Sequence, residues 1–243
     1  MFWRERIPGF SDSEPKAPSF GVEEQGAYIT KLWDSHGRNV IFPKTEINGK
    51  ARGGSHVCLP GFGPDEAGVY SQHGFGRDVL WQRTSDADTD IRLEYTEHEG
   101  DYKGLSARID YQLSPDSFST TLWVDNSSDV PLAISPGFHP YFEVEGSVLL
   151  NGEPIDVTAY ETPQIIIGTD KQVLQTSNHT IEISSYDLNT WVIWTDLRGG
   201  YLCVEPTLNG PGFNSQKPHK NELLQPGEVR DFSYLISWGD HLD

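Results

Sequence analysis

Hydrophobic and polar residues alternate over short stretches of this chain, and glycine, proline, asparagine and aspartate separate the stretches. A period of two places successive side chains on opposite faces of a β-strand. No segment repeats apolar residues at helical spacing, so we expect few helices or none. The expected strands are residues 27–33, 39–43, 78–83, 91–97, 105–113, 117–126, 148–151, 165–168, 180–184, 190–195 and 229–238.

Many short strands joined by turns are typical of an all-β sandwich or barrel. The Asn48-Gly49 pair suits the type I′ turn of a hairpin. Residues 52–63 are rich in glycine and proline, so we expect an irregular loop that forms part of a site. The chain has 243 residues and neither a fixed-period repeat nor a dividing linker. It predicts one domain at 26–243 after an N-terminal arm or edge segment at 1–25.

The charge of the chain excludes two classes of partner. Acidic residues outnumber basic ones 36 to 18, which gives a formal net charge of −18. Such a surface repels nucleic acid and anionic membranes. No apolar run approaches the about 20 residues of a membrane-spanning helix, and the charged first residues lack the apolar core of a secretory signal. We therefore expect a soluble, cytoplasmic protein; its oligomeric state does not follow from the sequence.

The two cysteines, Cys58 and Cys203, are too few for a disulfide scaffold. They are also too few for a zinc site unless histidines join them, and no paired spacing suggests one. The expectation is two buried thiols and no resident metal.

Two segments each carry one side chain that can move a proton near neutral pH. They are Ser135-Pro-Gly-Phe-His-Pro-Tyr-Phe142, with His139, and Tyr201-Leu-Cys-Val-Glu-Pro206, with Glu205. Alternation directs Tyr201, Cys203 and Glu205 to one face of a strand, and it directs His139 and Tyr141 to one face of another. The sequence predicts that the two segments face each other and form an acid/base pair.

Four motifs, in this order, resemble the aldose 1-epimerase (galactose mutarotase-like) superfamily, and its hexose-6-phosphate 1-epimerase branch most closely. They are Ala51-Arg-Gly-Gly-Ser-His-Val-Cys-Leu-Pro-Gly-Phe-Gly63, Ser71-Gln-His-Gly-Phe-Gly-Arg77, Gly137-Phe-His-Pro-Tyr-Phe142 and Cys203-Val-Glu-Pro206. The resemblance extends from about Gly26 to the C-terminus. It implies a β-supersandwich, two large antiparallel sheets packed face to face, with a sugar bound in a groove.

The resemblance also implies residue roles. Glu205 resembles the general base that takes the proton of the anomeric hydroxyl, and His139 resembles the general acid that protonates the ring oxygen. Arg52 and Arg77 resemble substrate-binding arginines. Gln72 and His73 resemble residues that contact the sugar. His56, in the same loop as Arg52, is a further histidine to examine.

The expected reaction interconverts the α and β anomers of an aldohexose, specifically a hexose 6-phosphate. Opening and closing a hemiacetal needs one proton donor and one proton acceptor, and no metal, nucleotide or covalent intermediate. Histidine suits the acid because its pKa lies near 6.5 when unperturbed. Glu205 has to stay ionised although it is partly buried, so we expect a nearby donor or cation to lower its pKa.

The chain departs from the branch pattern between the two motifs that carry His139 and Glu205. The branch has an aspartate in a Thr-Asp-Arg-like segment there, and residues 156–168 of this chain contain no such motif. A small basic group, Lys217, His219 and Lys220, follows the glutamate motif; it either receives an anion or is a solvated loop.

Three other functions stay open at this point. The first is an epimerase of neutral aldoses, and the second is a non-catalytic carbohydrate-binding protein on the same fold. A glycoside hydrolase is a weaker third, because that chemistry normally uses two carboxylates and only Glu205 stands out. Individually, His139 could be a core histidine and Arg77 could pair with Asp78 or Glu205.

Overall fold

The computed structural model describes residues 17–240 of the chain. Strands dominate this part, and its helices are three short 3₁₀ turns: η1 (Gly100–Tyr102), η2 (Val157–Tyr160) and η3 (Lys220–Glu222). The expectation of few helices is therefore confirmed. Among these residues no helix has the length and apolar character that crossing a membrane requires.

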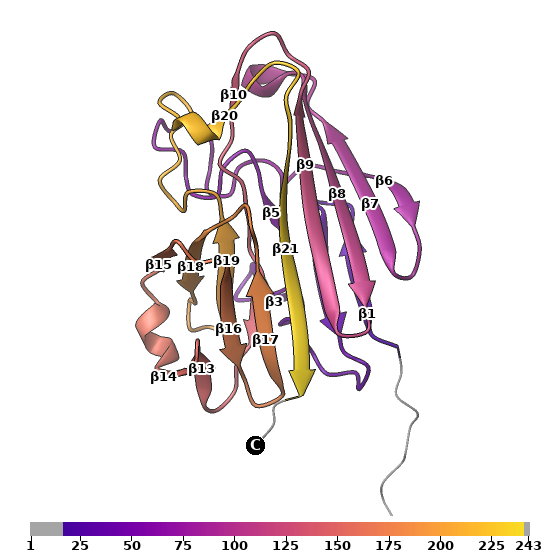
Figure 1. The fold of residues 1–243 in the computed structure, drawn as a ribbon, viewed down its shortest axis with the longest axis vertical. Helices are drawn as coiled ribbons and strands as arrows, with labels where there is room; N and C mark the ends of the chain where they lie inside the picture. Colours follow the sequence, from indigo (N-terminus) through magenta and orange to yellow (C-terminus); the bar gives the residue numbers. More distant parts are fainter. Residues whose placement is uncertain (1–16, 241–243) are drawn as a thin grey trace, which may run out of the picture.

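The larger sheet of the described residues has nine antiparallel strands, and β21 passes through it between β17 and β9 (Figure 1). In spatial order the strands are β14 (Glu153–Ile155), β13 (Val148–Leu150), β16 (Lys171–Gln175), β17 (His179–Ser184), β21 (Val229–Asp240), β9 (Ser117–Asn126), β8 (Leu105–Ser114), β7 (Asp90–Thr96) and β6 (Gln82–Asp86).

A second antiparallel sheet contains six strands within residues 17–240. Its order is β15 (Gln164–Ile167), β18 (Thr190–Trp194), β19 (Tyr201–Thr207), β11 (Gly137–Phe138) and β5 (Val57–Cys58), and β12 (Tyr141–Glu143) also pairs with β19. Three small pairs complete the fold: β1 (Ser19–Glu23) with β2 (Tyr28–Trp33), β3 (Thr45–Ile47) with β4 (Lys50–Arg52), and β10 (Leu132–Ala133) with β20 (Leu223–Leu224).

The two large sheets pack face to face around one hydrophobic core, which is the β-supersandwich that the sequence predicted. Alternate residues of the second sheet, such as Phe138, Leu202 and Val204, are buried in that core. The ring of Phe138 lies 4.7 Å from that of Tyr234 on the larger sheet, measured between centroids. The remaining residues of the same strands therefore face away from the core, and there they line the candidate site.

Most of the expected strands are present. The meander of β7, β8 and β9 agrees with the prediction to within one residue at each end. Asn48 and Gly49 have φ angles of 53° and 73°, as the expected type I′ turn requires. The sequence-predicted face assignments also hold, because Cys203 and Tyr201 cluster with Tyr141 while Leu202 and Val204 enter the core.

Two strand predictions were wrong, and some strands were missed. Residues 78–81 follow a turn and make only a single bridge, from Leu80 to Gln25, and β6 begins at Gln82. The Trp81 indole donates to the Gly76 carbonyl at 2.8 Å. Residues 39–43 make a single bridge, from Asn39 to Trp33. Strands β14 and β16 were not predicted. In the predicted N-terminal segment, residues 1–16 lie outside the described part and β1 pairs with β2, so the division at residue 25 stays a prediction.

Candidate active site

A cavity of about 740 Å³ opens on the face of the second sheet that points away from the core. Strands β18 and β19 form its floor together with the segment between β11 and β12, and the loops before and after β5 form its walls. The aromatic and ionisable residues that line it are Tyr28, Lys44, Lys50, Arg52, His56, Phe62, His73, Arg77, Asp78, His139, Tyr141, Trp194 and Glu205.

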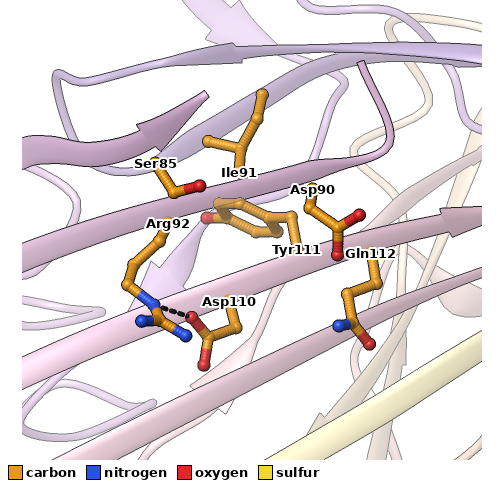
Figure 2. Close-up of a pocket in the computed structure, with 7 residues that line it drawn as sticks. All are labelled: Ser85, Asp90, Ile91, Arg92, Asp110, Tyr111 and Gln112. Carbon is orange, nitrogen blue, oxygen red and sulfur yellow. Dashed lines mark hydrogen bonds and ion pairs between the residues drawn. The ribbon is translucent and has the colours of Figure 1, made fainter. Parts of the chain in front are cut away.

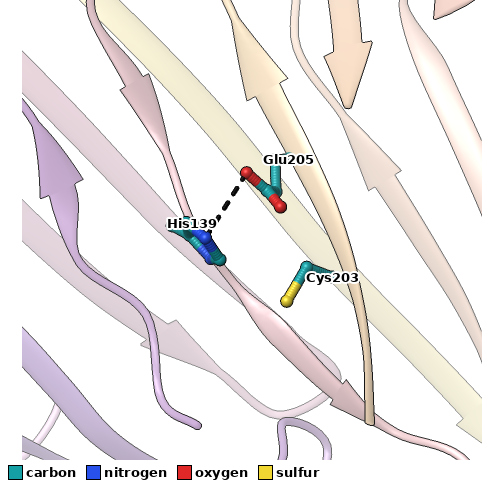
Figure 3. A group of neighbouring side chains, drawn as sticks. All are labelled: His139, Cys203 and Glu205. Carbon is teal, nitrogen blue, oxygen red and sulfur yellow. Dashed lines mark ion pairs between the residues drawn. The ribbon is translucent and has the colours of Figure 1, made fainter. Parts of the chain in front are cut away.

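Strand pairing brings His139 and Glu205 together on the cavity floor (Figure 3). Tyr141 lies opposite Cys203 in the register of β12 and β19, and the His139 amide donates to the His56 carbonyl at 3.0 Å. The Nε2 atom of His139 lies 3.6 Å from Oε2 of Glu205. Their side chains are only 5% and 2% exposed. Two titratable groups from distant parts of the chain are thus in contact in a buried environment.

Burial controls the protonation of this pair. It raises the pKa of the Glu205 carboxyl well above the ordinary 4.5. Burial, followed by the neighbouring His73, His56 and Arg77, lowers the pKa of His139 well below 6.5. The expectation of a donor or cation that keeps Glu205 ionised was wrong for the unliganded site: among the described residues, no hydrogen bond reaches its carboxylate and only His139 pairs with it.

His56 and His73, on the cavity wall, form a cluster with His139 on the floor. The ring centroids of His56 and His73 lie 4.9 Å and 4.8 Å from that of His139. The Nδ1 atom of His73 lies 2.8 Å from the Phe62 carbonyl, and since a carbonyl only accepts, Nδ1 carries the proton. Burial and then Arg77 lower the pKa of His73 to about 3. The cluster is therefore neutral, and its free ring nitrogens can accept hydrogen bonds from a ligand.

His73 and the Gly53-Gly54 pair, which lies before β5, have constrained backbones. His73 has a φ of 68°, a left-handed conformation that costs free energy for a residue with a Cβ atom. Gly53 and Gly54 have φ angles of 80° and 69°. A Cβ atom on either glycine would lie 2.1 Å from a carbonyl oxygen, that of Pro43 or of Ile29. The Gly-Gly pair after Arg52 thus lets the loop pass close to two other backbone segments and fixes the position of the arginine.

Arg52 lies at the cavity wall in an ion pair. Its Nε donates to Asp196 at 2.8 Å, and its Nη1 donates to the Ala51 carbonyl at 2.9 Å. Although burial opposes ionisation, hydrogen bonds from Tyr201 and Arg52 lower the pKa of Asp196 below its ordinary value. Sequence reasoning looked for this carboxylate within residues 156–168. Those residues instead form η2 and the outer strand β15. Asp196 was missed although a local signal exists, because Thr195-Asp196-Leu197-Arg198 is a Thr-Asp-Arg-like segment between the two motifs.

Arg77 also lines the cavity, but unlike Arg52 it has no hydrogen-bonded carboxylate among the described residues. Its Nε is buried without a hydrogen-bond partner in the described part of the chain, and the nearest carboxylate oxygen, of Asp78, is 3.9 Å away. Gln72 also lines the cavity and is exposed at its rim. Lys44 and Lys50 line it as well and were not predicted. Of the predicted basic group, Lys217 and Lys220 are exposed and do not line the cavity.

Both cysteines are buried thiols, as expected. The Sγ of Cys58 lies 3.4 Å from Nδ1 of His73, whereas Cys203 lies beside His139 and Glu205 (Figure 3). Burial raises the pKa of each thiol. Cys58 pairs with Gly137 and Cys203 with Tyr141 in the strand register, so the two thiols lie on opposite sides of the segment that carries His139.

A second depression, of about 250 Å³, lies on the larger sheet (Figure 2). Its polar residues include Arg92 and Asp110, which pair with each other at 2.6 Å. It holds no histidine and no buried carboxylate. It therefore lacks the proton-transfer chemistry of the cavity that contains His139.

Comparison with known proteins connects the chain to a family. The family model described as aldose 1-epimerase matches residues 19–177, a span that includes Arg52, Arg77 and His139 but ends before Glu205. No curated protein sequence matches the chain.

Solved structures share the fold at low sequence identity. A galactose mutarotase related enzyme from Lactobacillus acidophilus is 17% identical, with a TM-score of 0.78 over 95% of this chain and 97% of that one. A galactose mutarotase-like protein from Lactobacillus casei is 15% identical, with a TM-score of 0.78 over 93% and 98%. Galactose 1-epimerase from Lactobacillus acidophilus is 14% identical, with a TM-score of 0.69 over 95% and 93%.

Proposed function

The chain belongs to the aldose 1-epimerase family, and from this premise we propose that it interconverts the α and β anomers of a hexose 6-phosphate. His139 and Glu205 act as general acid and general base, and no cofactor takes part. The observation that carries this proposal is the 3.6 Å separation of Nε2 of His139 and Oε2 of Glu205 on the floor of a sugar-sized cavity.

The reaction needs two proton transfers in each direction. Glu205 takes the proton of the anomeric hydroxyl while His139 gives a proton to the ring oxygen, and the bond between C1 and the ring oxygen breaks. Rotation about the C1–C2 bond then presents the other face of the aldehyde. Closure returns both protons, so the enzyme ends in its starting state and no atoms are lost.

The pKa values of the free pair fit this cycle. Because the Glu205 pKa is raised and the His139 pKa is lowered, the resting pair consists of a protonated, neutral carboxyl and a neutral imidazole. A carboxylate with an imidazolium holds the same number of protons. Sugar hydroxyls that donate to Glu205 stabilise its carboxylate, which moves the proton to His139 and creates the required acid and base without uptake from solvent.

The cations of the cavity support a phosphorylated substrate. Arg77 offers a buried Nε without a hydrogen-bond partner among the described residues, and Lys50 and Arg52 lie on the same lining. A guanidinium binds a phosphate through charge-assisted hydrogen bonds, which are stronger than neutral ones. Local cations of this kind can attract an anion although the chain as a whole is acidic.

One observation favours a second candidate, an epimerase of neutral aldoses. Asp196 already accepts a hydrogen bond from Arg52, which reduces the positive charge available to a phosphate. In that case the cavity receives an unphosphorylated sugar, and the same His139 and Glu205 perform the same chemistry.

Exchange NMR tests both candidates and the residue roles. We expect the wild type to accelerate anomer exchange of glucose 6-phosphate above the buffer rate, and more than that of glucose. Glu205→Gln and His139→Ala should each slow exchange by about 10²–10⁴-fold. No acceleration on either sugar would refute the epimerase proposal. Sugar binding without acceleration would identify a carbohydrate-binding protein, and equal rates for both variants and wild type would refute the roles.

A further inference from the structure

Three metal-ligand side chains converge beside the proposed sugar site. A ring nitrogen of His139, Sγ of Cys203 and a carboxylate oxygen of Glu205 all lie within 4.8 Å of one another, and all three residues are buried (Figure 3). Alternation placed Cys203 and Glu205 on one face and predicted that the segment with His139 faces them, but the chain has no paired ligand spacing, so no metal was expected there.

We propose that His139, Cys203 and Glu205 bind a thiophilic divalent cation, with Zn²⁺ as the probe, and that the bound ion inhibits the enzyme by occupying its acid/base pair. The binding part is independent of the proposed function, and the inhibition rests on it. Zn²⁺ takes just these three ligand types, in protein sites that commonly use three side chains and leave a fourth position open.

The ligand atoms are available for an ion. Among the described residues, no hydrogen bond reaches the Glu205 carboxylate, and Nε2 of His139 has only that carboxylate as a polar partner, at 3.6 Å. Unsatisfied buried polar atoms cost free energy, and a coordinated cation would remove part of that cost at Glu205. The three residues also need little rearrangement, because Nε2 of His139 and Oε2 of Glu205 are 3.6 Å apart, a separation that one ion about 2 Å from each can bridge.

Ligand softness selects the ion. A thiolate and an imidazole favour Zn²⁺ and softer cations over Mg²⁺ and Ca²⁺, which prefer oxygen ligands. Arg77, whose charge acts on His139, opposes any cation. The thiolate of Cys203 and the carboxylate of Glu205 together supply two negative charges, which offset both the ion's charge and this repulsion.

Binding must release protons. Cys203 is a thiol whose pKa burial raises, so coordination of the thiolate transfers its proton to the buffer. The pair of Glu205 and His139 gives up its shared proton in the same event. The ion therefore removes the proton that the proposed reaction moves, and it also fills the space between the acid and the base.

Calorimetry with Zn²⁺ on the sugar-free protein tests binding directly. Wild type should bind one ion, and titrations in buffers of different ionisation enthalpy should report proton release. Cys203→Ala should weaken binding by at least about 100-fold, because loss of a mere outer-sphere partner already costs 10–100-fold. Cys58→Ala is the matched control, another buried thiol beside histidines, and it should bind Zn²⁺ like wild type. His98→Ala, at an exposed histidine, should also leave binding unchanged.

Exchange NMR then tests the inhibition. Zn²⁺ should slow anomer exchange by wild type and by Cys58→Ala, while Mg²⁺ at the same concentration should not. The exchange rate of Cys203→Ala, relative to its own rate without metal, should resist Zn²⁺. Absence of Zn²⁺ binding by wild type, or equal affinity of wild type and Cys203→Ala, overturns the site. Loss of binding in Cys58→Ala but not in Cys203→Ala overturns it too, and binding that leaves the exchange rate unchanged overturns the inhibition. Since the calorimetry uses no sugar, a protein without epimerase activity would still confirm or refute the metal site.

Discussion

Arg52 and Asp196 pair across 144 positions of the chain, with Nε of the arginine 2.8 Å from the carboxylate oxygen. Tyr201 donates its hydroxyl to the same carboxylate. The arginine is thereby held at the cavity wall, and part of its charge is neutralised before any ligand arrives. Asp196 thus has two opposing effects on an anionic substrate: it positions Arg52 and it weakens the field that Arg52 presents.

Asp196→Asn separates these effects. The asparagine oxygen can still accept from Arg52 at the place of Oδ2, while its NH₂ group takes the place of Oδ1 and donates to the Tyr201 hydroxyl oxygen. The position of Arg52 is thereby kept while the negative charge is lost. We expect KM for glucose 6-phosphate to fall a few-fold, equivalent to about 1 kcal/mol for a charge at this range. KM for glucose should not change. Steady-state kinetics on both sugars measures this, and a higher KM for the phosphorylated sugar would mean that the charge is needed to hold Arg52.

Arg77 should contribute more to phosphate binding than Arg52, because it lacks a hydrogen-bonded carboxylate among residues 17–240. Loss of a charge-assisted hydrogen bond costs about 1.5–3 kcal/mol. Arg77→Ala should therefore weaken glucose 6-phosphate binding by about 10–100-fold, and Arg52→Ala by less. Added salt should weaken binding to wild type and have less effect on Arg77→Ala.

The control for these arginine variants is Arg92→Ala, at an arginine of the larger sheet that pairs with Asp110 (Figure 2). It should leave the affinity for glucose 6-phosphate unchanged. If Arg77→Ala binds glucose 6-phosphate as tightly as Arg92→Ala does, the phosphate is not held by Arg77. Isothermal calorimetry at two salt concentrations distinguishes these results.

The sequence predicted the faces of the site strands because alternation is a local property. Glu205 lines the cavity and Cys203 packs with Tyr141 on the same face of the strand, while Leu202 and Val204 enter the core, as the period of two required. Turn chemistry was equally local, as Asn48-Gly49 illustrates. The same reasoning wrongly predicted a strand at residues 78–81. There Trp81 is buried and donates to the Gly76 carbonyl, so an apolar residue that resembles part of a strand pattern belongs to an irregular segment.

Long-range pairings could not be predicted in this way. Asp196 meets Arg52 because the loop between β18 and β19 approaches the end of β4, and no local pattern records that distance. The prediction that Glu205 is ionised failed for a related reason. Whether a carboxyl has a hydrogen-bond donor depends on side chains from other strands, and here burial determines the pKa of Glu205. The motif order nevertheless located His139 and Glu205 in segments that the fold joins.

Asp34 should be a major source of acid-sensitive stability. It is buried and accepts hydrogen bonds from the Arg38 amide and guanidinium, from His179 and from the His36 amide. Although burial opposes ionisation, these bonds lower its pKa from 3.8 to about 2. Its stabilisation, about 2 kcal/mol, is thus present above pH 3.8 and lost as the pH falls toward 2.

Urea unfolding of Asp34→Asn tests this. The variant should be less stable than wild type at pH 7 by about 3 kcal/mol, because it leaves Arg38 without its buried partner. The difference should shrink as the pH falls below 3.8. Asp240→Asn removes the exposed partner of the same arginine and should cost less than about 1 kcal/mol. Equal losses for the two variants would contradict the special role of Asp34.

Glu205 should lower the stability of the fold at neutral pH, and Glu205→Gln should raise it while slowing exchange by about 10²–10⁴-fold. Burial raises the carboxyl pKa above the 4.5 of the unfolded chain, so the folded state keeps a proton that the unfolded state releases. The contribution of Glu205 to wild-type stability therefore falls as the pH rises above 4.5, by up to about 1.4 kcal/mol per pH unit, until the folded-state pKa is passed. The buried histidines, whose pKa values are lowered, act in the opposite direction below pH 6.5, but they are common to variant and wild type. Glutamine does not titrate, so the unfolding free energies of variant and wild type should diverge from pH 4.5 upward.

Urea titrations from pH 4 to 8 measure this divergence. The control is Glu182→Gln, at an exposed glutamate of β17, whose unfolding free energy should run parallel to that of wild type. Parallel curves for Glu205→Gln as well would mean that the carboxyl is solvated or hydrogen-bonded in solution.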